Sequence, residues 1–343
     1  MGGLFQRSRL GLILPFAALV AVMIVHAIYW IVISGVVEDR ARAWIAAQER
    51  AGYEIEHQGL RVGGYPFRFT LHAAAPTITA PVSEGGWRAE LQRLAGTAQF
   101  YNLDHWIVTF GGPARLTAQG ETGPVVYQVG AETARLSLAA SSGATTRVGG
   151  DLDAVTFSAE SGPAPAVESA GQVRLSGFID ADDRFSFAVE AREVRLAETA
   201  LSPEVRAAFG DTAALARMAG ALTDWSVLSQ VGDPYAWTAA GGHVEVAAAQ
   251  LVWGPADLNG SGEITLDGEL RPAGRLSLIV TDPDTLITAL VDAGLVYHEQ
   301  GEALRLFALM APRRDTGIAL PFRLQDGGLF LGPARLGSVG AVD

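Results

Sequence analysis

The chain has 343 residues, with 37 Asp and Glu against 25 Lys and Arg, a net charge of −12 and no cysteine. Because nucleic-acid binding needs clustered basic side chains, this acidic balance argues against a nucleic-acid partner and against electrostatic adhesion to anionic lipid. Without cysteine the chain has no disulfide framework, thiolate zinc site or thiol nucleophile.

An apolar run, residues 10–33, contains no Asp, Glu, Lys or Arg. At about 1.5 Å of rise per residue it reaches about 36 Å as a helix, enough to cross a hydrocarbon core of about 30 Å with some tilt. The run exceeds the apolar core of about 7–15 residues in a cleavable signal peptide, and no small-x-small cleavage site follows it. We therefore predict a retained transmembrane helix.

The orientation follows from the segments that flank this helix. Arg7 and Arg9 precede it and Arg40 and Arg42 follow it, so the basic residues are nearly balanced. A short basic N-terminus usually stays in the cytoplasm, and a long following domain is translocated largely regardless of charge. We expect a single-pass inner-membrane protein with residues 1–9 cytoplasmic and the C-terminal domain periplasmic.

Residues 34–52 are predicted to form a stalk helix. Glu38 and Asp39 lie in its first turn and Gly52 follows its end, as helix dipoles and C-caps favour. Apolar residues at three-and-four spacing indicate that one face packs on the domain. A helix lying on the membrane surface is the alternative interpretation.

After Tyr53 the spacing of apolar residues changes from that of a helix to the alternation of a strand. Two strands are predicted on either side of a bend at Gly63 and Gly64, and the second carries four apolar residues on one face. These four are the candidate lining of an apolar ligand groove, and the alternative is a closed core that the sheets cover themselves. They are Tyr65, Phe67, Phe69 and Leu71.

Residues 77–198 are rich in predicted strands separated by Gly, Ser, Asp and Pro clusters. A change of phase near Arg192–Glu193 predicts a β-bulge. Ser202 and Pro203 then begin a predicted helix that continues to about residue 222.

The C-terminal part returns to strands and ends with two more helices and a hairpin. Asp282 is predicted to cap a helix that ends near residue 293, and residues 301–311 form another. A hairpin is predicted to pair residues 318–324 with 329–331.

The predicted fold class is α+β and mainly antiparallel β: a transmembrane helix followed by a large bent sheet, β-sandwich or groove with a few packed helices. Residues 53–343 form the β-rich domain, and a duplicated sheet-plus-helix plan that divides near residues 200–240 stays open.

No motif for covalent chemistry is present. The six histidines show no H-x-x-x-H or H-E-x-x-H spacing, and Asp180, Asp182 and Asp183 lack the twelve-residue calcium loop. No serine lies in G-x-S-x-G, and the chain has no lysine for S-x-x-K. We predict no catalytic, cofactor-binding or metal residue, and a protein that is not an enzyme.

Several segments of the chain form a recognisable set of motifs. They are residues 59–76 (GLRVGGYPFRFTLHAAAP), 251–254 (LVWG), 260–262, 267–268 and 321–337. Together they resemble a membrane-anchored family of Gram-negative bacteria catalogued as domain of unknown function 2125. The family has no established activity, so the resemblance implies placement and fold only. The strand entry Gly64–Phe67 after an anchor is similar, more loosely, to AsmA-like proteins, which implies β-rich grooves and lipid movement across the envelope.

The leading functional hypothesis is binding or handling of a lipid or other apolar envelope component, without covalent chemistry. The alternative is a structural or adaptor protein that docks an envelope protein through a sheet edge or the stalk helix. The expected partners are the bilayer, through the N-terminal helix, and a lipid or an envelope protein. The oligomeric state stays open.

Overall fold

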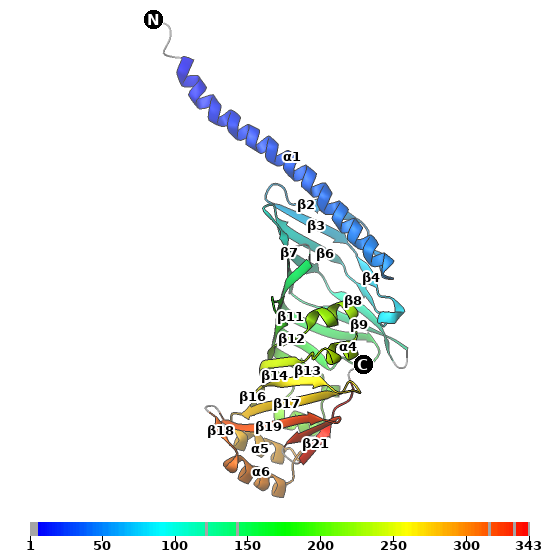
Figure 1. Ribbon diagram of the computed structural model, residues 1–343, viewed down its shortest axis with the longest axis vertical. Helices are drawn as coiled ribbons and strands as arrows, with labels where there is room; N and C mark the ends of the chain where they lie inside the picture. Colours follow the sequence, from blue (N-terminus) through cyan, green and yellow to red (C-terminus); the bar gives the residue numbers. More distant parts are fainter. Residues whose placement is uncertain (1–5, 121–122, 142–143, 315–316, 332–333, 342–343) are drawn as a thin grey trace. The chain divides into compact units, whose positions relative to one another are not determined.

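Figure 1 shows a computed structural model that describes residues 6–120, 123–141, 144–314, 317–331 and 334–341. The chain divides into two compact units, Met1–Gln119 and Gly120–Asp343. It is mostly antiparallel sheet, the sheet is open, and one long apolar helix precedes it. This confirms the predicted fold class. Residues 1–5 of the predicted cytoplasmic segment lie outside the described residues.

The first unit begins with α1, a continuous helix from Gln6 to Arg50. The segments predicted as transmembrane helix and stalk are thus parts of one helix. It ends where Gly52, at a φ of +99°, adopts a left-handed conformation that favours glycine and donates its amide to Glu49. The helix is long and apolar enough to cross a membrane.

Two groups of four antiparallel strands follow in the first unit, in the orders β1–β4–β5–β8 and β2–β3–β6–β7. The short helix η1 (Val82–Glu84) connects β4 to β5. The strands are β1 (Glu54–Glu56), β2 (Leu60–Gly63), β3 (Arg68–Ala74), β4 (Thr77–Thr79), β5 (Arg88–Glu90), β6 (Arg93–Gln99), β7 (Asn102–Gly111) and β8 (Ala114–Gly120).

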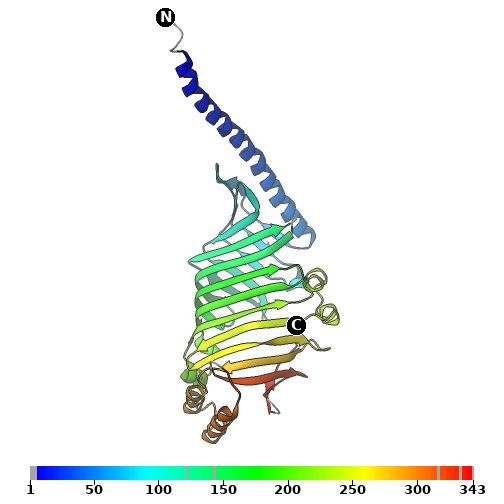
Figure 2. The ribbon, with the colours of Figure 1, turned by 60° about the vertical axis from the view of Figure 1, so that its left-hand side comes forward.

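The second unit is built on one antiparallel sheet whose neighbouring strands mostly follow chain order, as Figure 2 shows in green to red. Along β11, the first half pairs with β10 and the second half with β9. The strands are β9 (Gly123–Gly130), β10 (Thr133–Ser141), β11 (Ala144–Ser161), β12 (Val167–Ile179), β13 (Phe185–Leu196), β14 (Thr212–Leu222), β15 (Val244–Trp253), β16 (Ala256–Leu266), β17 (Pro272–Val280), β18 (Arg313–Arg314), β19 (Gly317–Gln325), β20 (Gly328–Leu331) and β21 (Ala334–Ser338).

The helix predicted for residues 202–222 is wrong beyond its first two turns. Ser202 does cap α2 (Pro203–Phe209) by accepting the Val205 amide, as predicted, and Gly210 then ends the helix at a φ of +78°. Residues 212–222 instead form β14, which pairs with β13 and β15 on its two sides. An alanine-rich sequence fits either a helix or a strand. Here the strand is favoured because its backbone hydrogen-bonds to a neighbouring strand on each side.

The remaining helices lie at the margins of the second sheet. Asp282 caps α5 through the Thr285 amide, which confirms the predicted cap, and the predicted hairpin is present as β19 and β20. Two short helices, α3 and α4, were not predicted. The helices are η2 (Glu198–Ala200), α3 (Trp225–Val231), α4 (Pro234–Ala239), α5 (Pro283–Asp292) and α6 (His298–Met310).

The β-bulge predicted near Arg192–Glu193 is not present as an extra residue in β13. Glu193 has a φ of +51°, but Arg192 faces Leu215 and Val194 faces Ala213, so the register with β14 is unchanged across it. Val194 and Leu196 continue the strand out of phase with Ala191.

We expect Gly220→Ala to lower the free energy of unfolding by about 1–3 kcal/mol, because a Cβ there would lie 2.1 Å from the Glu245 carbonyl oxygen. Denaturant unfolding of the detergent-solubilised full chain measures the effect. The control is Gly149→Ala, whose nearest contact would be 3.6 Å away at Ser137, and we expect a change within about 0.5 kcal/mol. Equal effects of the two substitutions would contradict the close strand approach at Gly220.

Candidate functional site: an open apolar sheet face

The four residues predicted to line a groove are placed in different environments. Residues 65–67 form a turn and β3 begins at Arg68, so Tyr65 and Phe67 do not share a strand face with Phe69 and Leu71, and that part of the prediction is wrong. Tyr65 is 50% exposed and Phe67 69% exposed, whereas Phe69 is completely buried. Whether these residues contact a ligand stays a prediction.

Helix α1 covers the buried part of this segment. The Trp30 ring stacks on Phe69 with centroids 5.6 Å apart and planes 13° apart, and its Nε1 donates to the Arg68 carbonyl over 3.0 Å. Leu71 contributes to a hollow of about 340 Å³ whose wall also includes Val37 of α1 and Trp106 of β7. Phe69 and Leu71 of β3 therefore serve chiefly to pack against α1.

The second unit carries a different and much larger apolar surface. In each antiparallel pair, directly opposite residues point to the same face, so the register identifies rows of side chains that cross the sheet. One row runs Gly150, Leu175, Val189, Met218 across β11 to β14, and continues through Ala249, Gly260, Leu278 and Leu320 to β19.

The rows on either side of this one are apolar as well. Among the described residues, every position of the three rows from β11 to β19 is a glycine or a hydrocarbon or thioether side chain. We call this surface the apolar face. Its other two rows are Val148, Gly177, Phe187, Gly220, Val246, Gly262, Leu276 and Phe322, and Leu152, Val173, Ala191, Ala216, Leu251, Leu258, Val280 and Ile318.

Glycines on this face give room to large neighbours on the adjacent strand. A Cβ on Gly150 would lie 2.7 Å from Leu175 Cγ, and one on Gly260 would lie 2.7 Å from Leu278 Cδ2. The leucine side chains thus lie over the glycine backbone instead of standing away from the sheet.

Helices cover the margins of the apolar face and leave its centre open. Ala308 and Ala311 pack on Val280 and Ile318 at the β17–β19 end. At the ends of the strands, Trp225 of α3 stacks on Phe185 and Phe209 of α2 stacks on Trp253. In the middle, Val189 and Met218 remain 43% and 42% exposed. Because monomeric proteins rarely expose large contiguous apolar surface, the open centre is the candidate binding site.

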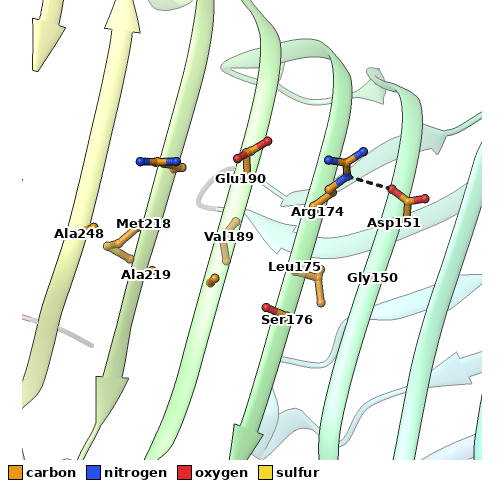
Figure 3. Close-up of a pocket in the computed structure, with 12 residues that line it drawn as sticks. Gly150, Asp151, Arg174, Leu175, Ser176, Val189, Glu190, Met218, Ala219 and Ala248 are labelled. Carbon is orange, nitrogen blue, oxygen red and sulfur yellow. Dashed lines mark ion pairs between the residues drawn. The ribbon is translucent and has the colours of Figure 1, made fainter. Parts of the chain in front are cut away.

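The opposite face of the same strands is polar, since consecutive residues of a strand point to opposite faces. Figure 3 shows Asp151, Arg174 and Glu190 in one row across three neighbouring strands, with Leu175 and Val189 in the row beside it. Arg174 Nε lies 3.6 Å from Asp151 Oδ1. Charges of alternating sign thus cross this face.

Small side chains form a second row on the polar face, next to these charges. A hollow of about 660 Å³ is bordered by this row and by the charged row, and the backbone of the row between them forms its floor. The small residues are Ser176, Ala188, Ala219 and Ala248.

Glu190 is held as a carboxylate beside this hollow. A hydrogen bond from Arg192, with the charges of Arg174 and Arg217 further away, holds the pKa of the Glu190 carboxyl below its ordinary value. The group therefore stays charged at neutral pH and is unsuited to general acid or base work there.

Within the described part of the chain, no three His, Cys, Asp or Glu side chains come together as a metal site. Asp183, one of the three aspartates weighed against a calcium loop, accepts the Ser226 amide and hydroxyl and so stabilises the start of α3. The sequence alone predicted the individual strands of residues 77–198. It missed the apolar face as a whole because the pairing register between strands was not known.

We expect Phe69→Ala to cost about 3–5 kcal/mol, because it removes a completely buried ring from beneath Trp30. Phe67→Ala, two positions away and largely exposed, should change stability by less than about 0.5 kcal/mol. Thermal or denaturant unfolding followed by tryptophan fluorescence compares the two variants. Similar losses of stability in the two variants would contradict the assignment of Phe69 to the contact with α1.

Comparison with known proteins gives one match. No curated protein and no solved structure shows detectable similarity to the chain. A family model described as "Uncharacterized protein conserved in bacteria (DUF2125)" matches residues 30–339, from the last part of the apolar helical run to β21 and the residue after it. Because the match covers most of the sequence and nearly the whole sheet, the chain belongs to the DUF2125 family of uncharacterised bacterial proteins.

Proposed function

We propose that this protein is a membrane-tethered binder of a lipid or similar apolar component of the bacterial envelope, and that it performs no covalent chemistry. The observation that carries the proposal is the apolar face, whose centre at Val189 and Met218 is not covered by the marginal helices. The resemblance of the strand entry at Gly64–Phe67 to AsmA-like proteins points in the same direction.

The size of the apolar face suits an acyl chain. The six strand spacings from β11 to β17, at about 4.8 Å each, extend about 29 Å. Since a bilayer core of about 30 Å contains two leaflets, one acyl chain needs about half that length. Each buried CH₂ contributes about 0.8 kcal/mol, so a chain on this surface needs no specific polar contact to bind.

The anchor supports this function by its location. A ligand that is insoluble in water is most concentrated in the bilayer, and α1, which is long and apolar enough to cross a membrane, would tether the chain to that source. We propose that α1 crosses the inner membrane with the sheet on the periplasmic side, on the argument that a short basic N-terminus stays in the cytoplasm.

Val189→Asp combined with Met218→Asp should remove lipid from the apolar face. The two residues are opposite partners at its centre, and an acyl chain that lay over their new carboxylates would have to remove the water around these charges, at a high cost in free energy. Full-length protein is reconstituted with a photoactivatable phospholipid, irradiated and mapped by mass spectrometry. We expect adducts on peptides of β13 and β14 in the unsubstituted protein and their loss in this variant. Adducts on α1 should persist.

The matched control is Ala188→Asp with Ala219→Asp. These residues are also opposite partners on β13 and β14 but point to the polar face, so the two variants place the same paired charge on opposite sides of one sheet. Adducts on β13 and β14 should survive in the control. Their absence from the unsubstituted protein would refute the lipid proposal and favour the adaptor role.

Protease added to spheroplasts tests the orientation. Digestion of everything beyond about residue 36, with an N-terminal fragment protected by the membrane, is the expected result. A full-length chain that resists protease in spheroplasts but is cut after lysis would place the sheet in the cytoplasm.

A further inference from the structure

Two neighbouring turns of the first unit expose aromatic rings to solvent. Tyr65 and Phe67 belong to the turn before β3, and Tyr101 belongs to the turn between β6 and β7. Phe67 is 69% exposed and Tyr101 74% exposed. The Phe100 amide donates to the Phe67 carbonyl over 3.2 Å, so the two turns lie side by side. We call Tyr65, Phe67 and Tyr101 the aromatic rim.

The rim is fixed at one level of α1 by three side-chain hydrogen bonds. His26 Nε2 lies 2.7 Å from the Pro66 carbonyl oxygen, and Tyr29 donates to the Phe100 carbonyl over 3.1 Å. The third hydrogen bond is donated by Trp30 Nε1 to the Arg68 carbonyl oxygen. Ring contacts reinforce the attachment, since His26 lies 6.0 Å from Tyr65 and 5.3 Å from Phe100 between centroids.

That level coincides with the expected edge of the hydrocarbon core. The uncharged run begins at Leu10, directly after Arg9, and a core of about 30 Å requires about 20 residues of helix. A span that begins at Leu10 therefore ends near Tyr29 and Trp30. Residues 16–25, just before the attached level, are exposed on every side.

We propose that the aromatic rim is embedded in the bilayer interface and holds the first unit against the membrane beside α1. This rests on the proposed membrane crossing and adds a second point of contact to it. The alternative, a free tether from which the unit hangs in water, would leave three large rings exposed at the very level where the bilayer ends.

The composition of the rim suits an interface. Residues 64–67 and 100–103 contain no charged side chain, and Arg68, exposed at the start of β3, supplies a cation next to them. Tyrosine and phenylalanine favour the boundary between headgroups and acyl chains, where an arginine can reach lipid phosphate. Anionic lipid is not required, since the chain as a whole is acidic.

The absence of cysteine from the sequence permits a direct test. Single-cysteine variants Phe67→Cys and Tyr101→Cys of the full chain are labelled with nitrobenzoxadiazole and reconstituted in phosphatidylcholine–phosphatidylglycerol vesicles. Lipids that carry a doxyl quencher near the headgroup should cause loss of emission at both positions. Val20→Cys, in the middle of the apolar run, is measured with lipids that carry the doxyl group near the end of the acyl chain, and its quenching reports whether α1 crosses the bilayer.

Val82→Cys is the matched negative control. Val82 is also an exposed apolar residue of the first unit, but it lies on η1 beside Pro81, which approaches Gly52 at the other end of α1. Its label should not be quenched. Quenching at 20 without quenching at 67 and 101 would overturn the rim proposal alone, whereas no quenching at 20 would overturn the membrane crossing on which both proposals depend.

Discussion

The register between neighbouring strands is the constraint on which the second unit depends. From β11 to β19 the opposite pairs of the three rows place apolar residues together, so hydrocarbon collects on one side and charge on the other. A slip of one residue at any pair would reverse the two sides of the next strand and place arginine beside leucine. The left-handed conformation of Glu193 changes the phase of β13 locally without shifting its register with β14.

A sheet with one apolar side normally obtains a second layer, either another sheet or a row of helices. Here the helices are short and lie at the margins, where aromatic rings such as Trp225 and Phe209 close the ends of the strands. The arrangement leaves a bordered hydrocarbon surface instead of a filled core. The proposed binding rests on the exclusion of water, so it would discriminate ligands by length and apolarity more than by headgroup.

The sequence predicted the mainly antiparallel architecture, the caps at Ser202 and Asp282 and the last hairpin, because these depend on local patterns and turn chemistry. It did not predict β14, since its alanines fit a helix or a strand and only two flanking partners decide between them. It also grouped Phe69 with Phe67. The burial of one ring and the exposure of the other depend on where α1 lies, which alternation along a strand does not reveal.

The continuity of α1 has a mechanical consequence. One rod extends from the apolar run to Arg50, and its second half is attached to β1, β2 and β3 without an intervening hinge. A helix that is longer than the local hydrocarbon thickness tilts to fit. Under the proposed membrane crossing, the first unit would tilt together with this rod, so the thickness of the surrounding bilayer would set the angle at which these strands approach the lipid.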